Sequence, residues 1–295
     1  MLSLHTNNAA LSAQNSLSRT QTSLSTSMTR LSTGYRINSA MDDAAGLQIA
    51  TRLKAQTSGM SVAMRNTQNS VSMLQTAEGA LDEVTNILTR MKDLATQSAD
   101  GSSSGADRTA MQSEYDALTD ELTNIVSNTS FGGNTLLSTK ADSKLNAAID
   151  FQIGASSGEK MTFNATVALG DMHTKLGATN TVHTYNSTGA AATGTGTAVA
   201  TSTAANTAIG NLSSAIDAVA TVRSSLGAAA NRLDHVYNNL SNVSTNTQNA
   251  TGRIMDVDFA TESAKMTSNQ MLMQAGTAML KQSNSMSSMV MSLLQ

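Results

Sequence analysis

Apolar side chains recur at helical spacing at both ends of the chain. Near the N-terminus, Leu17, Leu24 and Leu31 stand seven residues apart, with Met28 between the last two. Near the C-terminus, a spacing of three and four residues is carried by Leu272, Ala275, Met279, Met286, Met289 and Leu293. The other faces are rich in Ser, Thr, Asn and Gln. Each end therefore predicts a slender amphipathic helix that is marginal alone and needs a partner.

Longer helices are predicted inside these ends. One begins near Asp42 and runs to about Ala95, a second follows the turn residues 100–105, and a third begins near Ala205. Their apolar spacing breaks near Glu78 and at Arg223. The positions that we expect to pack these helices together are Leu74, Leu81, Leu88, Leu118, Leu122, Leu212, Val219, Leu226, Leu233 and Leu240.

The middle of the chain has a different pattern. Residues 151–153 and 161–167 alternate apolar and polar side chains around a Gly, Ser and Lys turn, which predicts a β-hairpin. Residues 178–206 consist largely of Ala, Thr, Gly, Ser and Asn, with almost nothing to bury. We expect this segment to be an exposed loop or a small vestigial domain.

These patterns together predict a mainly α fold, in which long paired helices form an extended coiled-coil rod with a small β-hairpin. Helices at the two ends of one chain can bury their apolar faces only against each other or against neighbouring copies. Repeated pairing of this kind produces an open helical assembly rather than a closed oligomer. A truncated chain that lacks both ends and still polymerises would refute this hypothesis.

Composition supports a rod and excludes several other classes of protein. The 295 residues include no proline, which would break long helices, and only 3% aromatic residues. A net charge of −3 gives no general attraction to nucleic acid. The chain lacks cysteine, and we see neither an ordinary secretory signal nor an apolar run long enough to insert into a membrane.

Side chains that suggest catalysis or metal binding are scattered. The four histidines show no metal-ligand spacing, and no cofactor site is expected. Two carboxylate pairs, Asp42 with Asp43 and Asp256 with Asp258, lack an accompanying base or nucleophile. We interpret these carboxylates as charges at helix starts. The sequence therefore does not predict an enzyme.

Several stretches resemble bacterial flagellin. They are RLSTGYRINSAMDDAAGLQIATRLKAQ at residues 30–56, VSMLQTAEGALDEVTNILTRMKDLATQSA, SFGGNTLL, TGRIMDVDFATESAKMTSNQMLMQAGTAMLKQSN and the final VMSLLQ. The resemblance covers roughly residues 1–170 and 205–295, in the same order as in the family. It implies a structural subunit of the bacterial flagellar filament, with a reduced outer region.

The resemblance also implies a division of the chain. Residues 1–42 would form the N-terminal helix of the filament's inner tube with a connecting loop, and residues 253–295 would form the C-terminal helix of that tube. Residues 43–170 and 206–252 would form the rod domain, and residues 171–205 a short exposed variable region.

Partners implied by the resemblance are other copies of the chain or related flagellins, the filament cap protein, the hook–filament junction protein and an export chaperone. Export would run through the flagellar type III apparatus without a cleaved signal peptide, to an extracellular filament. Residues that match the family's surface for the host receptor Toll-like receptor 5 are Arg90, Leu94, Gln97 and Glu114, although Asp93 stands where Glu is usual.

Two alternative functions compete with the filament subunit. A hook–filament junction protein shares the design with paired ends, and a non-flagellar coiled-coil rod would share the helices. The first resembles residues 30–56 less closely. The second predicts a membrane anchor or a passenger domain, and we find neither pattern in the sequence. Electron microscopy separates them, because only the filament subunit forms long filaments at neutral pH.

Overall fold

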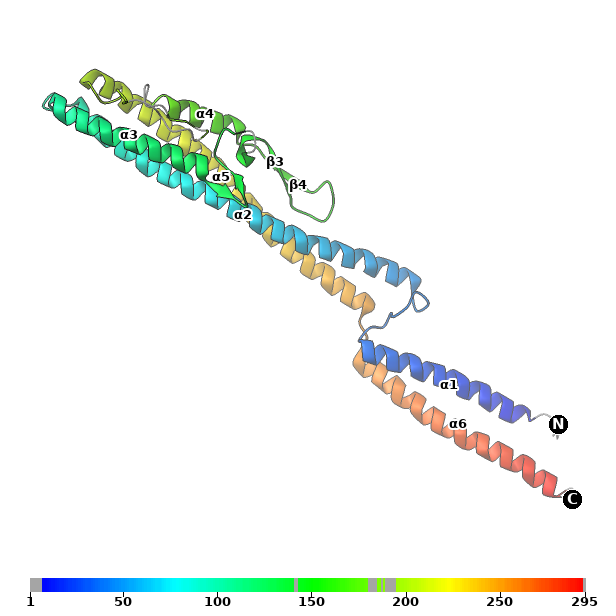
Figure 1. Ribbon diagram of the computed structural model, residues 1–295. Coiled ribbons are helices and arrows are strands. Elements are labelled where there is room, and N and C mark those ends of the chain that lie inside the picture. The colour runs from blue at the N-terminus through cyan, green and yellow to red at the C-terminus, as the bar shows by residue number, and fades with distance from the viewer. Residues whose placement is uncertain (1–6, 141–142, 180–184, 187, 189–194, 294–295) are drawn as a thin grey trace. The chain divides into compact units, whose positions relative to one another are not determined.

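The computed structural model describes residues 7–140, 143–179, 185, 186, 188 and 195–293, and these are mostly helical (Figure 1). The helices are α1 (Asn8–Thr33), α2 (Ala44–Ala99), α3 (Gly105–Asn128), α4 (Thr166–Gly177), α5 (Ser202–Met255) and α6 (Phe259–Leu293). The short elements are β1 (Ser130–Phe131), β2 (Asn134–Thr135), the 3-10 helix η1 (Lys144–Asn146), β3 (Ile149–Gln152) and β4 (Lys160–Phe163). The predicted mainly α class is confirmed.

The chain forms two compact units. Residues 1–57 and 245–295 make up one, here called the terminal unit, and residues 58–244 make up the other, the central unit. The N-terminal part of α2 and the C-terminal part of α5 thus belong to the terminal unit. The five-part division inferred from the resemblance stays a prediction.

The central unit has a continuous apolar core. Eight of the ten expected packing residues are buried, and only Leu118 and Leu240 are half-buried. Tyr115 of α3 is buried beside them and donates a hydrogen bond from its hydroxyl to the Thr179 carbonyl, 2.8 Å away. Burial raises the pKa of this hydroxyl. Leucine rows of this kind bury enough apolar surface to hold α2, α3 and α5 together.

The two interruptions of the apolar spacing face each other. Arg223 of α5 lies 2.9 Å from Asp82 and 3.9 Å from Glu78, both on α2. What appear in the sequence as two separate breaks are therefore one ion-pair cluster between two helices. Because these side chains are partly exposed, the cluster contributes little to stability.

The predicted hairpin exists, but its second strand is shorter than expected. β3 and β4 pair antiparallel with Phe151 opposite Met161, and the second strand ends at Phe163 instead of Val167. From Thr166 the chain forms α4, because Leu169, Met172 and Leu176 recur at helical spacing and are buried. A further hairpin, β1 with β2, turns at Gly132 and Gly133, which have φ of 58° and 83°.

The expectation of exposure for residues 171–205 is wrong for many of the residues that the structure describes. Val199 is fully buried, and its N–H donates to Gln112 Oε1 of α3 at 2.7 Å. Gly196 N–H donates to Asp116 Oδ2 at 2.8 Å. Residues 171–177 are held by the buried Met172 and Leu176 of α4, and residues 196 and 199 are held by backbone hydrogen bonds to α3. Part of it, residues 180–184, 187 and 189–194, lies outside the described residues.

The terminal unit is built around α1 and α6, which lie side by side (Figure 1). They run antiparallel, because Asn7 at the start of α1 contacts Ser283 and Ser27 near its end contacts Glu262. Threonine hydroxyls on α1 donate to carbonyls four residues earlier, as Thr22 does to Ser18 at 3.0 Å. Such bonds satisfy the hydroxyl groups of this Ser- and Thr-rich helix without tertiary partners.

Candidate assembly interface

The face of α6 that meets α1 is a row of less exposed residues at alternating spacings of four and three. We call it the inward row, and it comprises Glu262, Met266, Asn269, Met273, Gly276, Leu280 and Ser283. On α1 the matching face includes Leu24, which is buried, and Leu17 and Leu31, which are half-buried. The N-terminal apolar stripe thus points largely toward α6.

The C-terminal apolar stripe predicted from the sequence points elsewhere. We call it the outward row: Leu272, Ala275 and Met279, continued in the sequence by Met286, Met289 and Leu293. Leu272 is 56% exposed and Met279 is 68% exposed, and Met28 on α1 is 56% exposed. The outward row precedes the inward row by one residue, about 100° around the helix. The side chains of Met286, Met289 and Leu293 lie outside the description.

Sequence reasoning missed the inward row because its residues are less apolar. Met266, Met273 and Leu280 alternate with Asn269, Gly276 and Ser283. The signal was present in the Met, Met and Leu at seven-residue spacing. The outward row gave the stronger sequence pattern, because its apolar residues continue for two more turns.

Small residues let α1 and α6 approach closely. A Cβ placed on Gly276 would lie 3.3 Å from Leu17 Cδ1, and Cα atoms of the two helices come within 8 Å. Polar side chains close the far end of the pair, where Asn7 Nδ2 donates to Ser283 Oγ at 3.2 Å.

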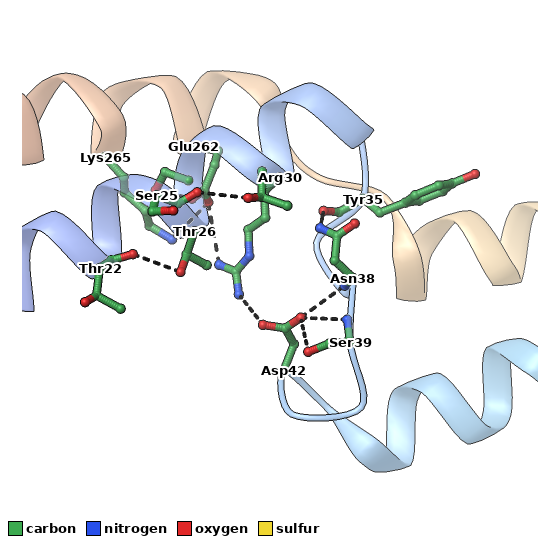
Figure 2. A network of polar contacts seen from close by, with 12 residues as sticks. Thr22, Ser25, Thr26, Arg30, Tyr35, Asn38, Ser39, Asp42, Glu262 and Lys265 are labelled. Atoms are coloured by element: carbon green, nitrogen blue, oxygen red, sulfur yellow. Dashed lines mark hydrogen bonds and ion pairs between the residues drawn. The ribbon is translucent and has the colours of Figure 1, made fainter.

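A cluster of charged side chains lies at the other end of the pair (Figure 2). We call Ser27, Arg30, Asp42, Glu262 and Lys265 the Glu262 cluster. Glu262 is only 4% exposed, and its Oε1 accepts a hydrogen bond from Ser27 Oγ at 2.6 Å. Its Oε2 lies 3.9 Å from Arg30 Nη1 and 3.7 Å from Lys265 Nζ, while Arg30 Nη2 reaches Asp42 Oδ1 at 3.7 Å. One carboxylate therefore contacts both α1 and α6.

Asp42 extends this cluster into the loop between α1 and α2. Its Oδ2 accepts hydrogen bonds from the N–H groups of Asn38 and Ser39, at 3.1 and 2.9 Å (Figure 2). These bonds, from Ser39 first, hold the pKa of the Asp42 carboxyl below its ordinary value, so the group stays ionised beside Arg30. The loop is thereby fastened to the helix pair.

The segment that follows α1 and the segment between α5 and α6 are joined by backbone hydrogen bonds. Tyr35 forms an antiparallel bridge with Asp256, in which Arg36 N–H donates to Met255 O at 2.6 Å and Val257 N–H donates to Gly34 O at 3.0 Å. Gly34 ends α1 with φ of 75°, a left-handed conformation that favours glycine.

Two of the four paired carboxylates, Asp43 and Asp258, lie at helix starts as predicted, whereas Asp42 lies in the loop of the Glu262 cluster and Asp256 follows the end of α5. Asp43 Oδ1 accepts from Gly46 N–H at 2.8 Å, and Asp258 Oδ1 accepts from Ala260 N–H at 3.0 Å. The Thr261 hydroxyl is the main cause that lowers the pKa of Asp258. Within the described ranges, no group of three or more His, Asp or Glu side chains is placed to hold a metal ion, and no helix is long and apolar enough to cross a membrane.

The residues that match the receptor surface of the family lie on α2 and α3 of the central unit. Arg90 and Gln97 are exposed, and Arg90 Nη2 pairs with Glu114 Oε1 at 2.6 Å. Leu94 is only 3% exposed. The structure thus brings Arg90 and Glu114 together on the surface and places Leu94 in the core.

Two family models match the chain. The bacterial flagellin N-terminal helical region matches residues 4–142, and the bacterial flagellin C-terminal helical region matches residues 209–294. These matches contain both α1 and α6. The chain belongs to the bacterial flagellin family. It is a subunit of the flagellar filament, an extracellular appendage, and the family is one of structural proteins.

Curated flagellins match along nearly the whole chain. Flagellin A of Vibrio anguillarum is 36% identical over 382 residues, which cover 100% of both chains. The flagellin of Halalkalibacterium halodurans is 39% identical over 263 residues, 89% of this chain and 88% of its own. Because the first alignment is longer than 295 residues, that flagellin contains segments that this chain lacks.

Among solved structures, a putative flagellar hook-associated protein from Vibrio parahaemolyticus has a TM-score of 0.55 at 16% identity, over 73% of this chain and 100% of its own. Likeness at this identity concerns the fold alone. The flagellin matches decide between the functions considered above, against the junction protein and the non-flagellar rod.

Proposed function

We propose that subunits join in the filament through the outward row of α6 and the exposed apolar side chains of α1. The exposure of these side chains in the single subunit carries this proposal. Leu272, Met279, Met28 and Leu11 are all more than half exposed, although each could bury most of its surface against an apolar partner. A second copy supplies such a partner, since the same rows are present on every subunit.

A groove beside Met28 supports a specific form of contact. It has a volume of about 570 Å³. Its lining combines Leu24 and Met28 of α1 and Met273 of α6 with the polar residues Gln21, Ser25, Thr29, Ser32 and Thr33. Methionine side chains adapt to irregular apolar partners. A side chain from the outward row of a neighbouring subunit is the occupant that we propose.

Replacing Leu272 and Met279 together by Ser tests this proposal. We expect the variant to stay folded in its central unit and to lose polymerisation, measured by sedimentation and by negative-stain microscopy. Gln274→Ser, on a polar and exposed part of the same helix, is the matched control and should polymerise normally. Filaments from the double variant at an unchanged critical concentration would refute the role of the outward row.

We also propose the assembly route implied by the family: export through the flagellar type III apparatus, an export chaperone on α6, growth under the cap protein and attachment at the hook–filament junction protein. The exposure of Leu272 and Met279 supports the chaperone step, because a chaperone could cover these side chains before assembly. Calorimetric binding of the chaperone should weaken in the double Ser variant and not in Gln274→Ser.

Recognition by Toll-like receptor 5 is a further proposal, supported by the exposure of the Arg90–Glu114 ion pair. Leu94 would act by packing underneath, since it is buried. Arg90→Asp should lower the response in a receptor reporter assay. Arg65→Asp, at an exposed position elsewhere on α2, should not. Full activity of Arg90→Asp would rule out this contact.

A further inference from the structure

The two apolar rows of α6 are close to equivalent between residues 272 and 280. A step of one residue exchanges Met273 for Leu272, Gly276 for Ala275 and Leu280 for Met279. Packing either row on α1 would therefore remove a similar area of apolar surface from water. Over these three positions, hydrophobic burial does not explain why α6 turns its inward row toward α1.

The rows differ clearly at the first turns of α6. The inward row begins with Glu262, whereas the position one residue earlier is Thr261. Glu262 is almost fully buried and satisfied by Ser27 and Arg30 of α1. A rotation of α6 by one residue would carry its carboxylate away from both groups. A threonine hydroxyl cannot replace the negative charge beside Arg30, so the rotation would remove the Ser27 hydrogen bond and one of the two carboxylate partners of Arg30.

The next turn favours the same choice. Met266 faces α1 in the observed arrangement, and the rotated one would bring Lys265 to that position. The Lys265 side chain is 59% exposed, and its ammonium group could still reach water from there. Lys265 therefore opposes rotation less than Glu262 does.

We propose that Glu262 is the specificity-determining residue of the terminal helix pair: it selects the inward row for α1 and so leaves the outward row free for neighbouring subunits. Single buried polar groups fix pairing in coiled coils in the same way. The consequence for assembly rests on the proposed function of the outward row, whereas the choice of face within one chain can be measured independently.

The absence of cysteine from the chain allows that choice to be read from engineered disulfides. Leu17→Cys with Gly276→Cys joins the faces that are in contact, since a Cβ at Gly276 lies next to Leu17. Leu17→Cys with Ala275→Cys joins α1 to the outward row. In the full-length chain, equilibrium in a glutathione buffer gives the effective concentration of each thiol pair, and we expect the first pair to dominate.

Glu262→Met, added to each cysteine pair, should reduce the preference for the Gly276 pair by at least about tenfold. Glu262→Gln, which can still accept the Ser27 hydrogen bond, should restore a substantial part of it. The matched control is Lys281→Met, at an exposed position in neither row, and it should leave the preference unchanged.

An unchanged preference in Glu262→Met would overturn the proposal. If that variant forms neither disulfide, Ser27→Ala decides, because it removes only the 2.6 Å hydrogen bond: a reduced preference supports the proposal, and an unchanged one overturns it. Failure of the proposed function has a different signature, namely normal polymerisation of the double Ser variant at Leu272 and Met279 with the disulfide preference intact.

Discussion

The central and terminal units have apolar residues at the same helical spacing, but these residues differ in burial. In the central unit, Leu81, Leu88 and Leu226 are essentially inaccessible to solvent. In the terminal unit, Leu272 and Met279 are more exposed than buried. The central unit thus completes its core within one chain, and the terminal unit leaves apolar side chains exposed. Equal spacing in a sequence does not imply equal burial in a monomer.

The largest expected effect contrasts one leucine from each unit. Leu81→Ala should lower the free energy of unfolding of the central unit by about 2–5 kcal/mol, because it leaves a cavity in a closed core. Leu272→Ala should change the stability of the unpolymerised chain by less than about 0.5 kcal/mol. Urea unfolding followed by near-ultraviolet circular dichroism of the buried Tyr115 and Tyr185 measures the first, and far-ultraviolet circular dichroism, which also detects α1 and α6, measures the second. Equal losses would break the comparison.

Acid should affect the central unit through His173, which lies 2.6 Å from the Tyr185 hydroxyl. Burial lowers the pKa of His173 from 6.5 to about 4. The unfolded chain therefore takes up the proton first, so the stabilisation is full above pH 6.5 and is lost as the pH falls toward 4. The loss at this residue is on the order of 3 kcal/mol. His173→Gln should unfold with a flatter pH dependence over this window; an identical dependence would contradict the assignment.

A smaller effect is expected at the end of α1 in the terminal unit. Gly34→Ala forces a side chain into a left-handed conformation, at a cost of about 1–2 kcal/mol. If the helix pair is needed for assembly, the critical concentration for polymerisation should rise roughly five- to thirtyfold. Gly101→Ala, in the central unit, has neither a positive φ nor a neighbour within 4 Å, and should leave that concentration unchanged.

The smallest expected effect compares a glycine of α6 that faces α1 with a glycine of α5 that has open space beside it. Gly210→Ala in α5 meets no atom within 4 Å and should gain about 1 kcal/mol of stability from helix propensity. Gly276→Ala should gain less, because its Cβ would lie 3.3 Å from the flexible end of Leu17. Thermal unfolding measured by far-ultraviolet circular dichroism compares the two, and equal gains would show that Gly276 is not needed for close approach.

The sequence could not predict which parts of the middle region are buried. Residues 195–200 contain small side chains and give no apolar period, yet hydrogen bonds from Gly196 and Val199 attach them to α3. These bonds use backbone donors, which every residue except proline has, so residue types do not reveal them. Similarly, Glu78 and Arg223 appeared only as interruptions until the structure placed them beside each other.

The sequence by itself determined that long helices form, where most of them begin and end, and which leucines line the central core. Those features depend on local periodicity and on turn residues such as Gly34. Only the tertiary structure decided which of two similar faces of α6 meets α1. We infer that this choice depends on polar contacts between residues far apart in the chain, such as Ser27 with Glu262, because the two apolar rows are similar between residues 272 and 280.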